Sequence, residues 1–465
     1  MSLASSHVFG FQPCFVHPRA AGLALRKRQC TILTNCADDS SFCLNDGEES
    51  SIRREIISGL IQAASSLQIQ KAAAREIQID TSTDGTVTLP LEPASGGTLC
   101  VRCTLFDAQS GAFKVYRAIV DTGSPYLVLP STEEPTAPSS WMGTSVTNVL
   151  NAFGSTRLDY GDRLLLQSEY AATEEIYGSV KGQIDWKLAE YKFRDPRLRI
   201  SSSDERGIVG VLDEALTKEA TGGADIEPYA LLGLIQNSNP NADRSRFPDP
   251  RPTFVEQEQI IQVTNDRVQS KIISFSVNGP DKELVLSTSS LITSDDNVMS
   301  LVDLRRYGDF VDHYAVKVNS VTFDGVAVSS KLLQRVTNSL VERPIVAVFD
   351  SGLTGCLLTR PFWDAMQQIK LKEETNRSDT SDQFHSVAIS VNNSAQRNRS
   401  GSTNTKIQSS KEEDPRLFYV DPIDLDWFDD EQTCPYVIVL GQTFLSKGNL
   451  IIDMERRVSS FKAVI

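Results

Sequence analysis

The sequence predicts a mainly β protein whose chain contains two similar halves. From about Gly85 onward, short segments rich in β-branched residues alternate with Gly and Pro, as expected for strands joined by turns. Within this region, two turns that contain an aspartate follow apolar runs, one at Asp121 and one at Asp350. Many short strands with frequent turns favour a barrel or a sandwich.

Length, composition and net charge limit the kinds of molecule that the protein is expected to bind. The chain has 465 residues, of which 40% are hydrophobic, enough for the cores of two large domains or three average ones. No uninterrupted apolar run reaches the ~18–20 residues that a membrane span needs. The formal net charge of −14 disfavours nucleic acid and anionic lipid as partners, because like charges repel.

Histidine and cysteine predict no other catalytic centre. The four histidines are His7, His17, His313 and His385. They support neither a Ser-His-Asp or Cys-His arrangement nor a zinc site. Cys100 and Cys103 fall in an expected strand, where residues three apart point to opposite faces, so we interpret them as buried thiols. Cys356 and Cys434 could pair in an oxidising compartment, and the sequence leaves this open.

The N-terminus differs in composition from the rest of the chain. Residues 1–37 contain no Asp or Glu but carry Arg19, Arg26, Lys27 and Arg28, which is typical of an organelle transit peptide. We therefore expect a targeting peptide at residues 1–45, for a plastid or a mitochondrion, with a secretory or vacuolar route as the alternative. Residues 46–83 are expected to form a prosegment or an N-terminal helix, because apolar residues recur there at helical spacing.

One long segment differs in amino-acid composition from the strand-rich sequence around it. Residues 372–415 are rich in Ser, Asn, Thr and charged residues and poor in aromatics. Such a segment cannot offset the entropy cost of ordering by burial. We therefore expect a disordered insert over residues 372–415.

The two aspartate turns carry the candidate chemistry. Two carboxyl groups a few ångströms apart cannot both ionise easily, so the pair shares one proton and titrates as a unit. If Asp121 and Asp350 form such a pair, one carboxylate can accept a proton from a water molecule that attacks a peptide carbonyl. The other carboxyl group can donate a proton to the developing oxyanion. This chemistry needs neither a metal nor a cofactor.

The residues beside each aspartate fit that role. Gly123 and Gly352 allow the backbone to turn tightly behind the carboxyl groups. The hydroxyls of Thr122 and Ser351 can reach the backbone of the opposite turn and hold the two turns together. The hydroxyl of Ser124 can donate a hydrogen bond to the first aspartate and lower its pKa.

Taken in order, these motifs resemble those of the pepsin-like aspartic peptidase family, over roughly residues 84–465. The two aspartate motifs are Asp121-Thr122-Gly123-Ser124 and Asp350-Ser351-Gly352-Leu353-Thr354. Each is followed by an apolar strand that ends in Gly, at Leu231-Leu232-Gly233-Leu234 and at Val439-Leu440-Gly441. A flap-like hairpin motif is Tyr177-Gly178-Ser179-Val180-Lys181-Gly182. The closing segment of the family is matched by Gly441-Gln442-Thr443-Phe444-Leu445.

The resemblance implies a bilobal fold of two six-stranded-type β-barrel lobes with a central cleft. The N-terminal lobe would span residues 84–268, and the C-terminal lobe would span residues 269–465. Asp121 and Asp350 would be catalytic, and Tyr177 and Gly178 would belong to a flap that closes over the substrate. The implied protein is a monomeric endopeptidase that acts on an extended peptide or protein, without cofactor or metal.

Two positions depart from the family pattern. Leu353 stands where the family usually has Thr or Ser, so the second aspartate loses a hydrogen-bond donor and its pKa is expected to rise. We therefore expect a pH optimum less acidic than that of a digestive pepsin. Val128 stands where many members carry a Trp that anchors the flap Tyr, so Tyr177 has no obvious anchor.

Two functions remain open at this point. An active aspartic endopeptidase is favoured, because both aspartates and both neighbouring glycines are present. The alternative is a catalytically inactive protein of the same fold that binds peptides or proteins. Cleavage of a peptide with apolar residues flanking the scissile bond distinguishes the two.

Overall fold

The computed structural model describes residues 85–106, 111–131, 164–177, 180–213, 216, 229–236, 251–262, 268–294, 296–309, 311–374, 384–392, 404–412, 418–423 and 434–463. All of these residues belong to one compact unit. The targeting peptide expected at residues 1–45, the prosegment or helix expected at residues 46–83 and the predicted flap residue Gly178 lie outside them. We call residues 85–271 the first half and residues 272–463 the second half.

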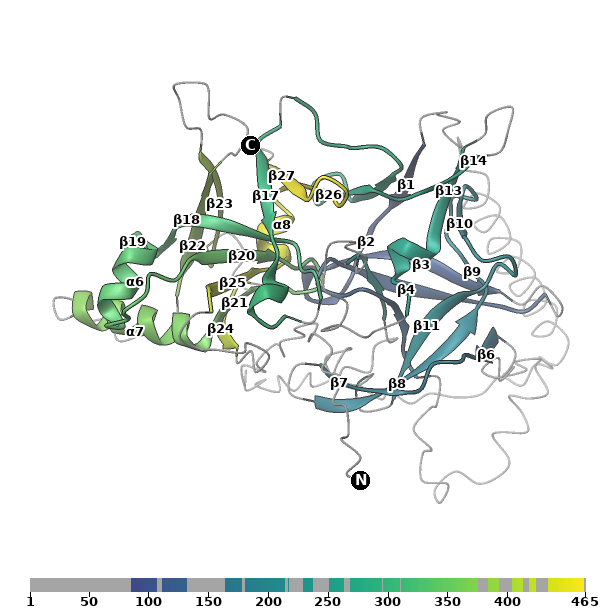
Figure 1. The fold of residues 1–465 in the computed structure, drawn as a ribbon, viewed down its shortest axis with the longest axis horizontal. Coiled ribbons are helices and arrows are strands. Elements are labelled where there is room, and N and C mark those ends of the chain that lie inside the picture. The colour runs from purple at the N-terminus through teal and green to yellow at the C-terminus, as the bar shows by residue number, and fades with distance from the viewer. Residues whose placement is uncertain are drawn as a thin grey trace, which may run out of the picture. The chain divides into compact units, whose positions relative to one another are not determined.

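The structure confirms a mainly β protein (Figure 1). The strands of the first half are β1 (Thr86–Pro90), β2 (Glu92–Pro93), β3 (Leu99–Phe106), β4 (Phe113–Asp121), β5 (Leu127–Leu129), β6 (Leu165–Gln167), β7 (Thr173–Tyr177), β8 (Val180–Ala189), β9 (Tyr191–Lys192), β10 (Leu198–Ile200), β11 (Gly207–Leu212), β12 (Ala230–Gly233), β13 (Glu258–Gln262) and β14 (Val268–Lys271).

The strands of the second half are β15 (Ser274–Asn278), β16 (Glu283–Ser287), β17 (Val298–Val302), β18 (Ala315–Phe323), β19 (Val326–Val328), β20 (Ile345–Phe349), β21 (Cys356–Thr359), β22 (Ser386–Asn392), β23 (Asn404–Ser410), β24 (Val420–Ile423), β25 (Tyr436–Leu440), β26 (Gly448–Asp453) and β27 (Val458–Ala463). The helices are η1 (Ser95–Gly97), α5 (Phe254–Gln257), η2 (Leu304–Tyr307), α6 (Ser330–Val336), α7 (Arg360–Glu374) and α8 (Gln442–Leu445). Helices α6 and α7 lie side by side (Figure 1).

Within the described residues, the strands form sheets of 14, 10 and 3 strands. The 10-stranded sheet holds β2 to β9, β11 and β12, and the 3-stranded sheet holds β10, β13 and β14. The 14-stranded sheet contains all strands of the second half and one strand of the first, β1, which pairs antiparallel with β16. The chain therefore crosses between its halves at its first described strand.

A ladder of the same design occurs once in each half. In the first half, β12 runs parallel to β4, with Gly233 opposite Asp121, and antiparallel to β5. In the second half, β25 runs parallel to β20, with Leu440 opposite Phe349, and antiparallel to β21. The central strands β12, β20 and β25 are buried at every position, which explains their continuous apolar sequences.

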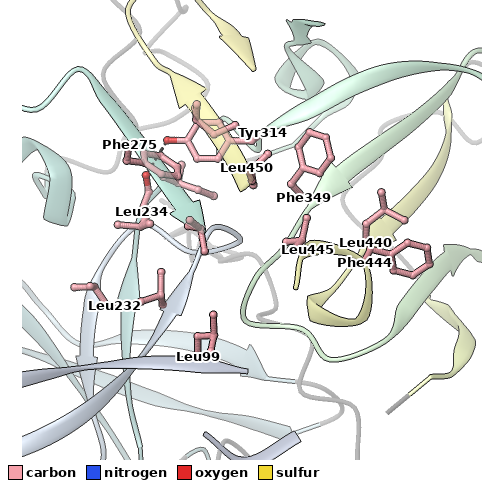
Figure 2. Packing of buried hydrophobic residues seen from close by; sticks show 14 of the residues in the cluster. Leu99, Leu232, Leu234, Phe275, Tyr314, Phe349, Leu440, Phe444, Leu445 and Leu450 are labelled. Carbon is pink, nitrogen blue, oxygen red and sulfur yellow. Dashed lines mark hydrogen bonds between the residues drawn. The ribbon is translucent and has the colours of Figure 1, made fainter. Parts of the chain in front are cut away.

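A single cluster of buried apolar side chains runs through both halves. Leu99 and Leu232 of the first half belong to the same cluster as Phe349 and Leu440 of the second (Figure 2). At the junction, the rings of Phe275 and Tyr314 meet edge to face, with centroids 5.4 Å apart. The core thus packs the two ladders together instead of isolating each.

The sheets are open, which differs from the expected barrels. None of the sheets closes, and the long sheet ends at β1 and β24, which do not pair with each other. Strand β18 branches the ladder, because it pairs with β17, β19, β20 and β22, and its pairing with β22 shifts register between Val318 and Ser320. A strand that serves several partners extends the sheet sideways, whereas closure requires each strand to have two neighbours.

The prediction of a disordered insert over residues 372–415 is wrong for two strands. β22 and β23 pair antiparallel over seven residues each, and β22 also pairs with β18. Val387, Ile389, Val391 and Ile407 are buried in the core. They alternate with polar residues, and this period of two buries one face of a strand although the average composition is polar. Residues 375–383, 393–403 and 413–417 lie outside the described part of the chain.

The interpretation of Cys100 and Cys103 as buried thiols on opposite faces is confirmed. Both are free and buried, and each belongs to a different apolar cluster. Cys356 and Cys434 are also free and buried. In the part of the chain that the structure describes, no helix has both the length and the apolar character required to cross a bilayer.

Candidate active site

The two candidate aspartates occupy equivalent positions at the ends of buried strands. Asp121 is the last residue of β4 and Asp350 follows β20 directly, and both are buried. In each turn the glycine two residues later donates its backbone N–H to the Oδ1 atom of the aspartate. The donor–acceptor distances are 2.7 Å for Gly123 and 3.0 Å for Gly352.

The two turns face each other closely. A Cβ atom placed on Gly123 would lie 2.7 Å from Cγ of Asp350, and one placed on Gly352 would lie 2.7 Å from Cγ of Asp121. Each glycine therefore packs against the carboxyl group of the opposite turn. A side chain at either position would push that carboxyl group away, so the close approach requires glycine.

The hydroxyls of Thr122 and Ser351 tie the two turns together. Thr122 Oγ1 donates to the carbonyl of Phe349 at 2.9 Å and accepts from the N–H of Ser351 at 2.9 Å. Ser351 Oγ donates to the carbonyl of Val120 at 2.7 Å and accepts from the N–H of Thr122 at 3.1 Å. The four bonds are reciprocal, and all are buried. Each hydroxyl therefore fixes the position of the other turn.

The strands behind the turns are fastened in the same way in both halves. The N–H of Gly233, at the end of β12, donates to the carbonyl of Tyr126 at 2.9 Å. The N–H of Gly441, just after β25, donates to the carbonyl of Gly355 at 2.8 Å. These are the two apolar strands ending in Gly that the sequence singles out, and each supports its own aspartate turn from behind.

The electrostatics of the pair are uneven. Burial raises the pKa of Asp121, while the Ser124 hydroxyl and the N–H of Gly123 oppose that rise. Burial also raises the pKa of Asp350, and the neighbouring charge of Asp121 adds to the rise, so this pKa lies well above its usual range. The two carboxyl groups therefore titrate as one unit, which loses a first proton and holds the second to higher pH.

The Oδ2 atoms of the pair are the carboxyl oxygens that lack a donor. Among the described residues, neither Asp121 Oδ2 nor Asp350 Oδ2 has a hydrogen-bond donor, although both atoms are buried. The two carboxyl groups interact directly with each other. A proton shared between them satisfies both groups, and this explains how a pair of carboxyl groups can be buried.

The residues after each glycine lie in different environments. Ser124 is buried near Asp121 and lowers its pKa, although Ser124 Oγ forms no bond of full hydrogen-bond geometry among the described residues. Leu353 is fully buried in an apolar cluster and gives Asp350 only its backbone N–H, at 3.2 Å. Thr354 Oγ1 lies beside Gly96 of η1, and the Thr354 carbonyl accepts from the N–H of Thr443. Thr354 therefore joins its turn to α8 through its carbonyl, and its hydroxyl packs against η1.

The flap-like motif forms a hairpin. Strands β7 and β8 pair antiparallel, with Tyr177 opposite Val180 at the tip (Figure 1). Tyr177 is thus the last residue of β7. The family resemblance implied a hairpin at this place in the chain, and the pairing of β7 with β8 agrees with it.

A buried histidine near the pair was missed by the sequence reasoning. His313 Nδ1 lies 2.6 Å from Asp309 Oδ2, both side chains are fully buried, and the histidine lowers the pKa of Asp121. The next residue, Tyr314, donates its hydroxyl to the carbonyl of Leu234 at 2.7 Å. The signal was a histidine four residues after an aspartate at the start of a buried strand. His313 completes no nucleophilic triad, so residue type alone does not single it out.

Comparisons with known proteins assign no family. Neither the models of known protein families nor the curated protein sequences gave a match to this chain. The function of this chain is therefore inferred from the geometry of its site and from its sequence motifs.

Proposed function

We propose that the protein is an aspartic-type endopeptidase that hydrolyses peptide bonds with a water molecule activated by Asp121 and Asp350. One observation carries the proposal: the two carboxyl groups face each other across reciprocal turns, each packed on the glycine of the other. Carboxyl pairs that share a proton are suited to water activation at mildly acidic pH. The resemblance to the pepsin-like family supports the same reaction.

The uneven pair suggests which carboxyl group plays which part. Asp121, the more readily ionised group, accepts a proton from water as the water oxygen attacks the peptide carbonyl carbon. Asp350, which keeps its proton, donates that proton to the carbonyl oxygen, so a neutral tetrahedral diol forms. Asp121 then donates the proton it took from water to the amine nitrogen, and one diol hydroxyl returns its proton to Asp350. The C–N bond breaks, which leaves a carboxylic acid and an amine and restores the carboxyl pair. No bond to the enzyme forms at any step.

The proposal includes the bilobal arrangement of the family, with the substrate held between the halves as an extended strand. The β7–β8 hairpin would cover the peptide, and apolar side chains would flank the cleaved bond. The protein would act as a monomer without cofactor. Its pH optimum would lie above that of a digestive pepsin, because Leu353 gives Asp350 no hydroxyl.

Peptide cleavage tests the proposal. The purified protein is incubated with a peptide with apolar residues at the scissile bond, from pH ~3 to ~7, with and without pepstatin, and compared with the Asp350→Asn variant. The expected result is cleavage that pepstatin blocks and that Asp350→Asn abolishes. Cleavage that survives in Asp350→Asn would contradict the proposal. Binding of the peptide without cleavage would instead indicate the inactive peptide-binding protein.

A further inference from the structure

A buried arginine stack lies at the base of the β7–β8 hairpin. The guanidinium carbon of Arg251 lies 3.7 Å from the ring centroid of Trp186 and 4.9 Å from that of Tyr126. The two rings also meet each other edge to face, with centroids 4.9 Å apart. All three residues are buried, and Arg251 is only 6% exposed. The guanidinium is therefore held between two aromatic faces and has little access to water.

The stack joins three segments that are distant in the sequence. Trp186 lies in β8, Arg251 lies just before α5, and Tyr126 lies on the same turn as Asp121, just before β5. Thr173 of β7 completes the stack, because its Oγ1 accepts from Trp186 Nε1 at 3.0 Å and from Arg251 Nη1 at 3.4 Å. One guanidinium thus contacts both strands of the hairpin and the segment that follows the first aspartate.

A second set of contacts holds the hairpin within its own sheet. The Asp213 carboxylate accepts from the N–H groups of Gln183 at 2.6 Å and Leu216 at 2.8 Å. These bonds hold β8 to the end of β11, within one sheet. The arginine stack adds a polar link between the hairpin and the turn of Asp121. It lies beside the apolar cluster that contains Ile184 and Val128, and beside the pairing of β8 with β11 and of β11 with β5. A buried guanidinium is costly to desolvate, so its position is explained if the two rings and Thr173 compensate for the lost water.

We propose that Arg251 is a positioning residue that couples the β7–β8 hairpin to the Asp121 turn through Trp186, Tyr126 and Thr173. The stack takes the place of the Trp that is absent at Val128 and gives the hairpin a different anchor. The coupling itself is independent of enzymatic activity. Its kinetic consequence rests on the proposed function: a loosened hairpin would hold the substrate poorly and raise KM more than it lowers kcat.

Hydrogen exchange of the full chain tests the coupling. We compare wild type with Arg251→Met, which keeps a long side chain but removes the charge, and with Arg251→Lys, which keeps the charge. Arg251→Met is expected to reduce amide protection in β7 and β8 about tenfold, equivalent to about 1.4 kcal/mol. Arg251→Lys should restore part of that protection. Unchanged protection of the hairpin in Arg251→Met would overturn the proposal.

Two further variants keep the test decisive. Thr173→Val removes the shared acceptor without changing the shape or the charge, and it should reduce hairpin protection even if Arg251→Met fails to fold. Unchanged protection in Thr173→Val would also count against the coupling. Arg199→Met, at an exposed arginine of β10, is the matched control and should alter neither protection nor kinetics.

Kinetics distinguish the coupling from the proposed function. With an active protein, Arg251→Met should raise KM about tenfold while kcat falls less than threefold, about 1.4 against 0.6 kcal/mol. A tenfold fall in kcat with an unchanged KM would refute the positioning role. If the wild type cleaves no peptide, the proposed function fails, while the exchange experiment still decides whether Arg251 couples the hairpin to the turn.

Discussion

The Asp121 turn and the Asp350 turn have the same backbone arrangement, but the side chains around them differ. Each lies at the end of a buried strand, with a parallel strand behind it and a hydroxyl that bonds the other turn. After the glycine, however, the first turn has Ser124 and the second has Leu353, which is buried among apolar residues. His313 lowers the pKa of Asp121. The pKa of Asp350 instead rises well above its usual range, through burial and the charge of Asp121.

Two turns with the same backbone arrangement can therefore hold carboxyl groups in unlike electrostatic surroundings. The repeated ladder places two carboxyl groups face to face, and the unequal neighbours then separate their pKa values. Two titratable groups whose environments push their pKa values apart can serve as base and acid at one pH. Substitutions at equivalent positions of the two turns test this difference.

The largest effect is expected at the paired glycines. Gly123→Ala or Gly352→Ala places a methyl group 2.7 Å from the Cγ atom of the opposite aspartate. A misplaced carboxyl group should lower kcat/KM by about 100-fold or more, and overpacking should cost about 1–3 kcal/mol of stability. Because the turns are equivalent in this respect, the two variants should behave alike in peptide cleavage and urea unfolding.

Gly325→Ala provides the control for that pair. Gly325 has φ +87° and no atoms near its added Cβ, so the substitution is strained without touching the site. It should lower stability by about 1 kcal/mol and leave kcat/KM unchanged. A fall in kcat/KM of Gly325→Ala would mean that the loss of folding stability, and not the displaced carboxyl group, explains the lower kcat/KM of the Gly123 and Gly352 variants.

The next effect concerns the reciprocal hydroxyls. Thr122→Val and Ser351→Ala each leave a buried N–H and a buried carbonyl without a partner. Each should cost about 1–3 kcal/mol in the free energy of unfolding, measured with urea. Nearly equal losses are expected because the bonds are mirrored. A loss confined to one variant would show that only one turn needs the other.

The dependence of stability on pH compares the aspartates without requiring activity. A carboxyl group whose folded-state pKa is raised favours the folded state at low pH, and this advantage is lost as pH rises from the unfolded pKa of about 3.9. Asn cannot ionise, so the stability of Asp350→Asn relative to wild type should increase from pH 4 to pH 7. Asp121→Asn should change in the same direction, because it removes one raised pKa and also the charge that raises the pKa of Asp350. A urea midpoint that shows no gain over wild type from pH 4 to pH 7 in either variant would contradict the shared proton.

Leu353→Thr should make the second turn resemble the first. A hydroxyl near Asp350 stabilises its ionised form and lowers its pKa, so the alkaline limb of the kcat/KM profile should move to lower pH. Leu353 is fully buried, and its truncation should cost about 2–4 kcal/mol of stability. An alkaline limb that stays in place would mean that the missing hydroxyl does not set the pKa of Asp350.

The smallest effect is expected at Ser124. Ser124→Ala removes a group that lowers the pKa of Asp121, so the acid limb of the kcat/KM profile should move to higher pH. The unfolding free energy should change by less than about 1 kcal/mol, because Ser124 Oγ forms no bond of full geometry among the described residues. A shift of the alkaline limb instead would assign Ser124 to the wrong carboxyl group.

Local features of the fold and of the site were predictable from the sequence. The apolar runs before Asp121 and Asp350 follow from residue type and short-range spacing. The hairpin at Tyr177 and the apolar strand before Gly441 were expected from the family resemblance. The reciprocal hydroxyls of Thr122 and Ser351 were predictable because the two motifs repeat, although the residues are distant in the chain.

Features built from distant residues could not be predicted. Tyr126, Trp186 and Arg251 meet only in the folded protein, and no local pattern links them. Strand β22 was missed because the polar composition around it outweighed the alternation of its buried residues. The closure of a sheet also depends on which strands become neighbours, and the branching at β18 is set by tertiary packing.

The position of β1 has a consequence for any maturation of the chain. Val87 and Leu89 are fully buried, and β1 is hydrogen-bonded to β16 of the second half. A protease that trims the N-terminus can therefore remove residues only up to about Gly85 before it must pull a strand out of the core. The same clasp implies that two polypeptides split near residue 271 should reassemble into a working pair only when the first piece keeps Thr86–Pro90.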